Sequence, residues 1–429
     1  MTTAVVGAGP VGMVVALALA ERGEQVVLVD PDAGPPADGS WPRRGVMQFL
    51  HPHFFRHHVR RVLEERVPTM WDAVVAAGGV VNDPLPGMPP SMTTLACRRS
   101  TFEAALRRAL EHDRIRVLTG FAESVVVQRD RVAGLVVDGG ALAVDRVVAS
   151  HGRRGDLGEQ WRPPVEGGPC GQSYVSRMYQ TRPGVEPLRS WLPHGARYDG
   201  YEAIAFPQDA GTMSALVVRA SDDPRLEMLW DTAAFEAAVA AIPNLAPWTD
   251  PAASVPLTPV MRGGTLTNTY RGQGTPPAGL LFVGDAVCTT NPSAGRGVTL
   301  GLWQAEALLD ALEVGDDRDA SRAFDAWCEA QVRPWFADHL VEDDWIVRRY
   351  AGEDLDPEGV LPSGVAVDAA AEHDGLMPAV QQYLAMHAPP SSLAAVEDEV
   401  RGLVRGGWRP GYAEGPGVGE IVDLVAAAR

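Results

Sequence analysis

Three glycines near the N-terminus have the spacing of a phosphate-binding turn. Gly7, Gly9 and Gly12 follow a short apolar run at residues 3–6 and begin an apolar helical pattern that continues to Arg22. Gly7 permits a sharp exit from a strand, Gly9 lets the backbone approach a pyrophosphate, and Gly12 lets the helix lie close to the sheet. The free N–H groups and the positive end of the helix dipole also favour an anion. The motif therefore predicts a nucleotide site.

Asp30 supports this prediction. It ends the next apolar run, residues 25–30, which we expect to form the second strand of a βαβ unit. From that position its carboxylate can accept hydrogen bonds from an adenosine ribose. A plain βαβ unit with an incidental acid is the less favoured interpretation, because the turn, the helix and the acid occur together.

Residues 51–58 form a histidine-rich stretch before and within an expected helix. His51 and His53 are candidates for substrate positioning or proton transfer. His53 and His57 are four residues apart and could share a helix face, which is the geometry of a two-ligand metal site. However, the sequence suggests no third carboxylate or cysteine ligand nearby, and Pro52 places His53 before the helix. We therefore predict no metal site.

The composition excludes several classes of function. The chain has 429 residues and a formal net charge of −18, which argues against a nucleic-acid partner and against an anionic membrane surface. The sequence contains no lysine, so all 37 basic residues are arginine and any mechanism that needs a lysine amine is excluded. Four scattered cysteines predict free thiols in a reducing cytoplasm. The run at residues 13–20 is too short to span a bilayer, so we expect a soluble, cytoplasmic protein.

The pattern of apolar residues indicates elements that would position these groups. Residues 115–149 have a period of two and predict an antiparallel meander that leads back to a parallel sheet. Residues 165–265 differ in texture, with strand candidates at residues 174–181, 203–206 and 213–219 and one amphipathic helix at residues 232–241.

Two further segments bring polar residues to the expected nucleotide-binding part. A helix is predicted to begin near Arg99, capped by Ser100 or Thr101. A buried strand at residues 279–283 leads through Gly284 and Asp285 into a loop and a helix at residues 298–312. From residue 321 onward the chain is predicted to be mostly helical, with polar loops near residues 352–378 and 406–419.

Together these segments resemble the flavoprotein monooxygenase superfamily with the hydroxybenzoate-hydroxylase-type FAD-binding fold, and most closely its bacterial secondary-metabolism members of epoxidase-like and halogenase-like type. The motifs that carry the resemblance are Gly7-x-Gly9-x-x-Gly12 with Asp30, Arg43-x-Gly45-Val46, Arg99 at a helix start, and residues 281–286 followed by 292–297. The resemblance implies an α/β fold: a Rossmann-like FAD-binding domain, an inserted and mostly antiparallel β-sheet substrate domain, and a helical C-terminal region.

The resemblance also assigns segments and residues. The FAD-binding domain is expected at residues 1–75, 98–164 and 266–333, an excursion of the substrate domain at 76–97, the substrate domain at 165–265 and the helical region at 334–429. Asp285 would contact the ribityl chain, Arg43 and Arg99 the pyrophosphate and ribityl region, and backbone amides near Gly295 and Gly297 the flavin ring. The implied cofactor-binding set is Gly7, Gly9, Gly12, Asp30, Arg43, Arg99, Gly284, Asp285, Gly295 and Gly297, and Pro292 joins His51 and His53 as a catalytic candidate.

One segment departs from the superfamily pattern. Where an Asp-Gly pair usually follows the meander, this sequence has His151-Gly152. The missing acid leaves open whether NAD(P)H reduces FAD directly or a separate flavin reductase supplies the reduced cofactor.

The resemblance implies an oxidoreductase: an FAD-dependent monooxygenase of natural product biosynthesis. It would transfer one oxygen from a flavin C4a-peroxide to an apolar or aromatic small molecule, by hydroxylation or epoxidation, with O2 as co-substrate. The alternatives are a flavin-dependent dehydrogenase or reductase, a flavin-dependent halogenase, and a non-enzymatic binding protein. Halogenases of this type rely on a lysine that this chain lacks, and the presence of Arg43, Arg99 and Asp285 argues against a protein that has lost its cofactor.

Overall fold

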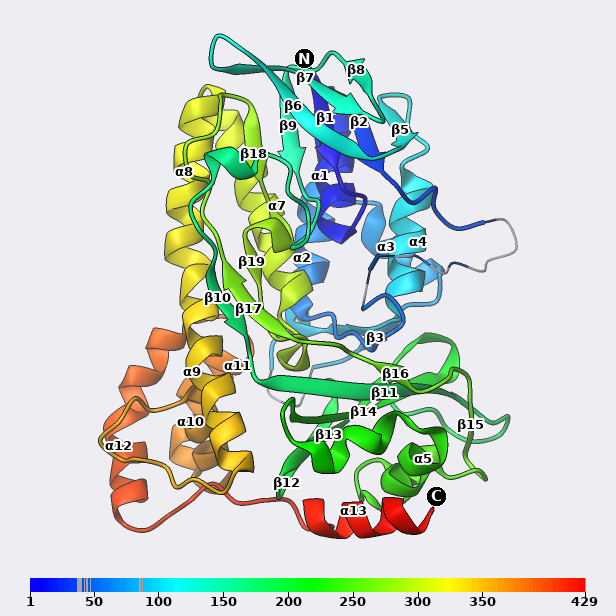
Figure 1. Ribbon diagram of the computed structural model, residues 1–429, viewed down its shortest axis with the longest axis vertical. Helices are drawn as coiled ribbons and strands as arrows, with labels where there is room; N and C mark the ends of the chain where they lie inside the picture. The colour runs from blue at the N-terminus through cyan, green and yellow to red at the C-terminus, as the bar shows by residue number, and fades with distance from the viewer. Residues whose placement is uncertain are drawn as a thin grey trace. The chain divides into compact units, whose positions relative to one another are not determined.

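The computed structural model describes residues 1–36, 41, 43, 45–46, 48–84, 86 and 88–428, and in this part the chain forms two compact units (Figure 1). Unit 1 comprises Met1–Gly167 and Thr269–Arg333, and unit 2 comprises Gly168–Asn268 and Pro334–Arg429. The chain therefore passes three times from one unit to the other.

Unit 1 is built on a five-stranded parallel sheet. In spatial order its strands are β18 (Leu280–Phe282), β9 (Arg146–Ala149), β1 (Thr2–Val6), β2 (Gln25–Asp30) and β5 (Ile115–Thr119). The central strands are runs of Val, Leu and Ala that are buried along almost their whole length. This pattern is typical of a parallel sheet covered on both faces.

Helices of unit 1 follow the strands as the sequence predicts. They are α1 (Pro10–Glu21), α2 (His57–Arg66), α3 (Met70–Ala76), α4 (Arg99–Ala109), α7 (Gly297–Val314) and α8 (Asp317–Gln331). The predicted cap of α4 is wrong: the helix begins before Ser100, its N-cap is Arg98, and no side chain caps it. The helix can start earlier because the Arg99 side chain pairs with Glu103 one turn ahead.

The predicted meander is present as a separate antiparallel sheet of β6 (Ala122–Gln128), β7 (Arg131–Val137) and β8 (Gly140–Leu142). Its tight turn places Asp138 at φ 46° and Gly139 at φ 74°, the positive values that such hairpin turns require. Residues 76–97, expected as an excursion of the substrate domain, lie in unit 1 and contain β3 (Val80–Asn82) and β4 (Thr94–Ala96). The remaining short strands are β10 (Glu166–Pro169), β17 (Thr267–Tyr270) and β19 (Cys288–Thr289).

Unit 2 contains a larger antiparallel sheet. Its strands are β12 (His194–Tyr198), β13 (Tyr201–Pro207), β14 (Thr212–Ala220), β11 (Gln172–Thr181) and β15 (Ser254–Pro256) in spatial order, and β16 (Met261–Arg262) also pairs with β11. One face packs against α5 (Thr232–Ala241) and α13 (Val418–Ala427) through a core that includes Tyr179, Tyr201 and Phe235. Fully buried tyrosines suit this core because their hydroxyl groups reach partners, as Tyr179 does with Glu236 at 2.7 Å.

The other helices of unit 2 are α6 (Ala246–Thr249), α9 (Arg333–Tyr350), α10 (Ser363–Glu372), α11 (Met377–Leu384) and α12 (Ala394–Arg405). Helix α10 lies where the sequence predicted a polar loop, and that prediction is wrong because its apolar residues Val365, Ala366 and Ala369 are buried in the helical layer. The α/β fold with a parallel sheet, antiparallel sheets and C-terminal helices is confirmed.

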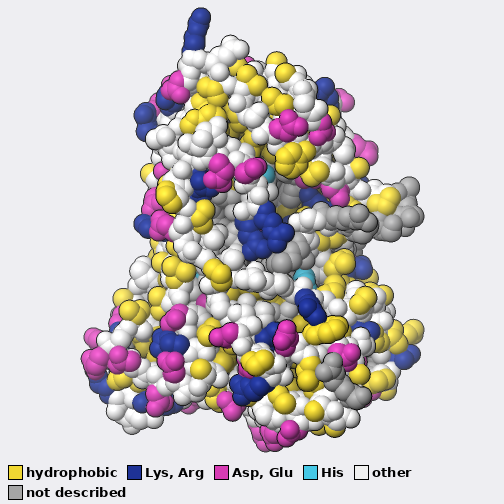
Figure 2. All heavy atoms as spheres, in the orientation of Figure 1, with side chains coloured by type: hydrophobic (Ala, Val, Ile, Leu, Met, Phe, Trp, Pro, Cys, Tyr) yellow, Lys and Arg dark blue, Asp and Glu magenta, His cyan; other side chains and the backbone are white. Residues whose placement is uncertain are grey.

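Two surface properties bear on function. Figure 2 shows acidic side chains interspersed with arginines over the visible face, so the net charge of −18 is spread rather than gathered there in one patch. Among the described residues, no helix has both the length and the apolar character needed to cross a bilayer.

Candidate functional site

The glycine turn between β1 and α1 is closely packed from behind. Gly7 has φ +102°, and a Cβ at this position would stand 2.4 Å from the carbonyl oxygen of Ser150. A Cβ on Gly12 would stand 1.9 Å from the carbonyl oxygen of Gly7 and 2.4 Å from Ser150 Oγ. The Ser150 hydroxyl itself donates to the carbonyls of Val6 (2.9 Å) and Gly7 (3.0 Å). These two glycines are therefore required by the protein's own packing.

Gly9 is different, because it faces open space. Among the described residues, no atom lies within 4 Å of the position that a Gly9 Cβ would take. Helix α1 begins immediately afterwards with Pro10 at its first position, and Gly9 accepts the first helical hydrogen bond from Met13. The next backbone N–H groups belong to a helix N-terminus and have no intrahelical acceptor. This arrangement fits the close approach of a pyrophosphate.

Asp30 stabilises the turn as well as lying beside it. The residue is 6% exposed, and its Oδ2 accepts hydrogen bonds from the Ala8 N–H at 2.6 Å and from Arg43 Nη2 at 3.1 Å. Oδ1 accepts from the Asp32 N–H at 2.8 Å. The sequence predicted a ribose contact for this carboxylate. The structure adds a second role, because the carboxylate also binds the backbone of the glycine turn at Ala8 and of the loop after β2 at Asp32.

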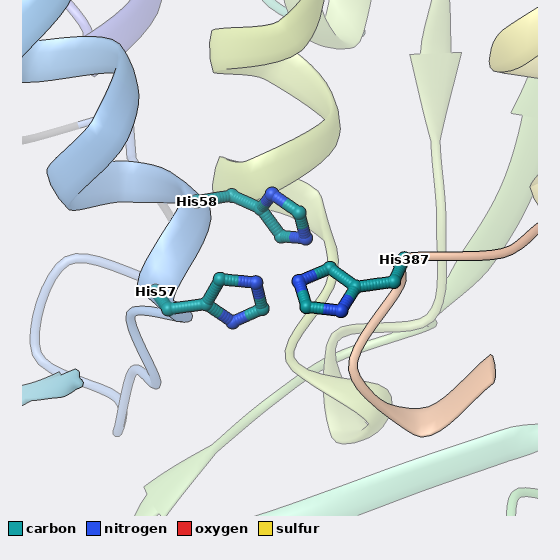
Figure 3. Close-up of side chains that lie close together, drawn as sticks. All are labelled: His57, His58 and His387. Carbon is teal, nitrogen blue, oxygen red and sulfur yellow. The ribbon is translucent and has the colours of Figure 1, made fainter. Parts of the chain in front are cut away.

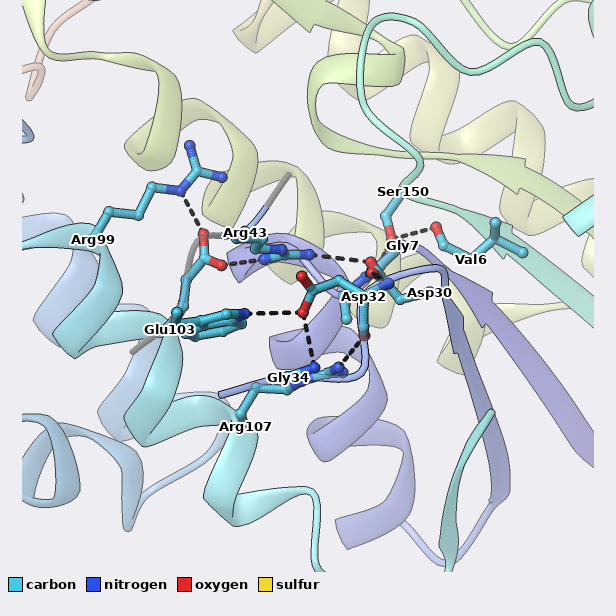
Figure 4. Close-up of polar contacts among 12 residues, drawn as sticks. Val6, Gly7, Asp30, Asp32, Gly34, Arg43, Arg99, Glu103, Arg107 and Ser150 are labelled. Atoms are coloured by element: carbon cyan, nitrogen blue, oxygen red, sulfur yellow. Dashed lines mark hydrogen bonds and ion pairs between the residues drawn. The ribbon is translucent and has the colours of Figure 1, made fainter. Parts of the chain in front are cut away.

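Buried ion pairs connect Asp30 to α4 (Figure 4). Arg43 lies between Asp30 and Glu103, and Glu103 also binds Arg99 Nε one turn earlier on the same helix. Burial alone would lower the pKa of Arg43, but the charges of Glu103 and Asp30 raise it above its ordinary value. Sequence reasoning missed Glu103; its position four residues after Arg99 on a predicted helix was the only signal.

His53 lies before α2, so it does not share a helix face with His57. Its Nδ1 is 3.0 Å from the His51 carbonyl oxygen and its Nε2 is 3.5 Å from Arg99 Nη1. A carbonyl can only accept, so the hydrogen bonds assign the proton to Nδ1 and leave Nε2 as an acceptor for Arg99. Burial, assisted by the charge of Arg99, lowers the pKa of His53 to about 3. His53 is therefore neutral near pH 7 and unsuited to act as an imidazolium acid.

His57 and His58 make aromatic contacts in which His53 takes no part. The rings of His57 and His58 lie 3.9 Å apart between centroids (Figure 3). The His58 ring also meets the Trp303 ring of α7 edge to face at 4.7 Å. The contact with Trp303 joins the start of α2 to α7. The buried His51 precedes α2, and its carbonyl oxygen accepts the hydrogen bond from His53 Nδ1.

The loop after β18 presents Asp285 outward. Gly284 has φ +72°, and its N–H donates to Gln304 Oε1 at 2.9 Å. The Asp285 side chain is exposed, yet the surrounding protein raises the pKa of its carboxyl group, with Arg99 and Arg153 partly opposing the shift. Arg99 lies beside His53, with its Nη1 3.5 Å from His53 Nε2, and its charge acts to lower the pKa of both His53 and Asp285.

Arg162 holds this loop in place, and no motif in the sequence indicated this role. The guanidinium group donates to the carbonyls of Ala286 (2.6 Å), Arg271 (2.6 Å) and Gly272 (3.1 Å). It also lies over the Phe282 ring at 4.2 Å. Burial lowers the pKa of Arg162 to about 10, which still leaves it charged at neutral pH.

The start of α7 completes the open side. Gly295 has φ +63° and Gly297 begins the helix, and no atom of the described residues lies within 4 Å of where a Gly297 Cβ would stand. Pro292 opens the short turn before it. A Cβ on Gly295 would be 3.4 Å from Phe54, and Arg56 Nη2 donates to the Ala294 carbonyl at 2.9 Å. The fold thus brings the segment of His51 and His53 beside the loop of Pro292.

Val11 joins the two halves of the site. A Cβ on Gly284 would meet its side chain at 3.4 Å, and a Cβ on Gly301 of α7 would meet it at 2.6 Å. The first turn of α1 is therefore wedged against both the Asp285 loop and α7. All ten predicted cofactor-binding residues lie in unit 1.

His151 does not replace the charge of the missing acid. Burial lowers its pKa, so the ring is neutral near pH 7. Its Nδ1 lies 2.9 Å from the Gly152 carbonyl oxygen, and its ring packs against Phe282 with centroids 6.4 Å apart.

Solved structures of FAD-dependent monooxygenases share this fold. PqsL from Pseudomonas aeruginosa, a probable FAD-dependent monooxygenase, is similar with a TM-score of 0.61 and 15% identity over 82% of this chain and 98% of PqsL. A triple mutant of the flavin-dependent brominase Bmp2 has a TM-score of 0.62 and 15% identity over 94% and 98% of the two chains.

A third similar structure is a mutant of 2-methyl-3-hydroxypyridine-5-carboxylic acid oxygenase. It has a TM-score of 0.57 and 17% identity, and the match covers 83% of this chain and 94% of the oxygenase. No protein-family profile matches the sequence, and no curated protein matches it significantly.

Proposed function

We propose that this protein is an FAD-dependent monooxygenase. The observation that carries the proposal is the contact around Val11, which sets the open glycine turn beside the Asp285 loop and the start of α7. An FAD molecule needs these two features side by side, one for its pyrophosphate and one for its ribityl chain and flavin ring. The similarity to flavin-dependent oxygenases supports the same conclusion.

The residues present fit FAD. The amides after Gly9 would hold the pyrophosphate, Asp30 the ribose, and Asp285 the ribityl hydroxyls. The N-terminus of α7, opened by Gly297, would direct its dipole at the flavin ring, where negative charge gathers on reduction. The open space at Gly9 and Gly297 is the evidence for fit, because a Cβ there meets nothing in the described protein but would obstruct a cofactor.

When bound, FAD would supply the activation of O2. The chain's own contribution is then to bind, orient and keep water away rather than to provide a catalytic dyad. Arg99 would bring positive charge toward the flavin half of the site, with His53 as its neutral hydrogen-bond acceptor. His51, His53 and Pro292 are proposed as positioning groups beside the ring.

We propose an apolar or aromatic small molecule as substrate and hydroxylation or epoxidation as the reaction, in bacterial natural product biosynthesis. Bmp2 is a brominase on the same fold. We favour oxygen transfer over halogenation because this chain has no lysine. The neutral His151 in place of an acid favours electron supply by a separate flavin reductase over direct reduction by NAD(P)H.

The first test is cofactor selectivity. Purified protein should bind FAD at micromolar or lower concentration and bind FMN at least about tenfold more weakly, because FMN lacks the adenylate half that the glycine turn would hold. Flavin fluorescence quenching measures both affinities. Failure to bind either oxidised or reduced FAD would remove the proposal.

The second test follows the electrons and the oxygen. The FAD complex is reduced anaerobically with NADH, NADPH or a flavin reductase, mixed with isotopically labelled O2 and offered apolar aromatic and alkenyl compounds. We expect efficient reduction only with the reductase, and products that carry one labelled oxygen. Rapid reoxidation by organic acceptors with no labelled product would favour a dehydrogenase, and rapid reduction by NADPH alone would refute the two-component arrangement.

A further inference from the structure

Glu103 is a fully buried carboxylate that serves two arginines. It lies on α4 with no exposed surface, and its Oε2 accepts from Arg43 Nη1 while its Oε1 accepts from Arg99 Nε (Figure 4). An ionised carboxylate in such a position is stable only if it is paired and hydrogen-bonded. The two guanidinium groups therefore offset the cost of burying the Glu103 carboxylate.

Arg43 and Arg99 differ in how far their guanidinium groups remain available to a ligand. The Arg43 side chain is 4% exposed and is enclosed by Glu103 and, at 3.1 Å, by Asp30. The Arg99 side chain is 16% exposed; its Nε is committed to Glu103, and its Nη1 faces His53. Arg99 also acts on Asp285, whereas the contacts of Arg43 point back to the glycine turn through Asp30.

We propose that Glu103 is the positioning residue that aims Arg99 at the flavin half of the site, and that Arg43 is the internal counter-charge of Glu103 and Asp30 rather than a ligand of the cofactor. The inference rests on the proposed function. The family resemblance gives Arg43 and Arg99 the same role, as ligands of the pyrophosphate and ribityl region. This inference assigns them different roles.

The geometry explains how one carboxylate can do this. A hydrogen bond to Nε fixes the plane of a guanidinium group and therefore the direction of its two Nη atoms. A ligand that binds these atoms then costs less side-chain conformational entropy. The four charges Asp30, Arg43, Glu103 and Arg99 alternate along the network and sum to zero. Neutralising Glu103 would leave Arg99 without its anchor and Arg43 with one carboxylate in place of two.

The experiment uses the full chain and isosteric variants. We compare the wild type with Glu103→Gln, Arg99→Gln and the double variant, and use Glu111→Gln as the control because Glu111 is exposed just beyond the same helix. The measurements are the FAD dissociation constant, the visible circular dichroism of bound flavin and the melting temperature of the FAD-free protein. The dichroism reports the surroundings of the ring, which a purely structural role of Glu103 would leave unchanged.

We expect Glu103→Gln to weaken FAD binding about tenfold or more, the effect of losing one charge-assisted hydrogen bond, and to change the flavin dichroism. Glu111→Gln should bind as the wild type does. The double variant should bind no more weakly than Arg99→Gln alone, because both changes remove the same interaction.

A second variant keeps the inference testable if Glu103→Gln does not fold. Arg43→Gln should lower the melting temperature but weaken FAD binding less than Arg99→Gln does. The inference is overturned if folded Glu103→Gln binds FAD normally, if the losses of Glu103→Gln and Arg99→Gln add, or if Arg43→Gln costs more affinity than Arg99→Gln. Failure of the wild type to bind FAD would instead count against the proposed function, so the two failures are distinguishable.

Discussion

The two halves of the candidate site are built in different ways. The phosphate half, Gly7 to Asp30, is one continuous stretch of chain. It would bind the cofactor through backbone amides and through the space that its glycines leave free. The flavin half gathers Arg99, Arg162, Asp285 and the start of α7 from distant parts of the chain, and it relies on charged side chains. A steric change should therefore damage the first half, and a change of charge or hydrogen bonding should damage the second.

The largest effect is expected for Gly12→Ala. The added Cβ would stand 1.9 Å from the Gly7 carbonyl oxygen, so α1 must move away from the sheet. We expect a loss of about 3 kcal/mol or more in the free energy of unfolding together with loss of FAD binding. Denaturant unfolding of the FAD-free protein measures the first effect, and an unchanged midpoint would show that the turn is not packed as described.

Arg162→Met should come next, since it removes a side chain that binds three backbone carbonyls. Leaving these acceptors unpaired should cost about 2–4 kcal/mol in the free energy of unfolding, and the freed Asp285 loop should weaken FAD binding. Arg154→Met, at an exposed position in unit 1, is the matched control. Equal melting temperatures for the two variants would contradict the role of Arg162.

Gly9→Ala tests the open side of the phosphate half against Gly12→Ala. Its new Cβ meets no described atom within 4 Å, and its φ of −73° suits alanine. The FAD-free protein should keep its stability within about 0.5 kcal/mol. FAD affinity should nevertheless fall about tenfold or more, because the methyl group takes the place of the pyrophosphate. An unchanged FAD affinity would show that the pyrophosphate does not bind at Gly9.

Asp285→Asn should separate binding from stability. The surrounding protein raises the pKa of Asp285 by displacing water from its carboxyl group, so the folded protein disfavours the ionised form. Stability therefore falls as the pH rises from the ordinary pKa of the carboxyl group through the raised one. Asparagine has no carboxyl proton to lose and stays neutral over this pH range. The variant should therefore melt at a higher temperature than the wild type, by a margin that grows with pH across this window, while it binds FAD more weakly. Melting curves of the FAD-free proteins across this pH window check the sign.

Near pH 7 the smallest effect is expected for His53→Gln, because its contribution to stability should change only in acid. The pKa of His53 is lowered to about 3 in the folded protein. Between the ordinary pKa of histidine and about 3, the unfolded chain binds a proton that the folded protein does not, so stability decreases as the pH decreases. The slope from this group is at most about 1.4 kcal/mol per pH unit. The variant should match the wild type near pH 7 and lose this part of the acid dependence; an equal dependence would mean that His53 is charged in the folded state.

The sequence predicted some elements closely. Helix α5 begins at Thr232 and ends at Ala241 as predicted, and the meander turns at Asp138 and Gly139. Both depend on local patterns, namely a helical period and a turn dipeptide. The cap of α4 and the helix α10 were predicted wrongly, because an ion pair one turn along the helix and burial against neighbouring helices outweighed the local signals.

By itself, the sequence determined how the proposed phosphate half of the candidate site is assembled. Gly7, Gly9, Gly12 and Asp30 are joined by one strand, turn, helix and strand, so chain connectivity alone places them together. The tertiary structure decided how the flavin half is held. Arg43 pairs with Glu103 across 60 residues, and Arg162 binds Ala286 across 124. Partners at such separations meet only through packing of the whole unit, and no spacing in the sequence encodes them.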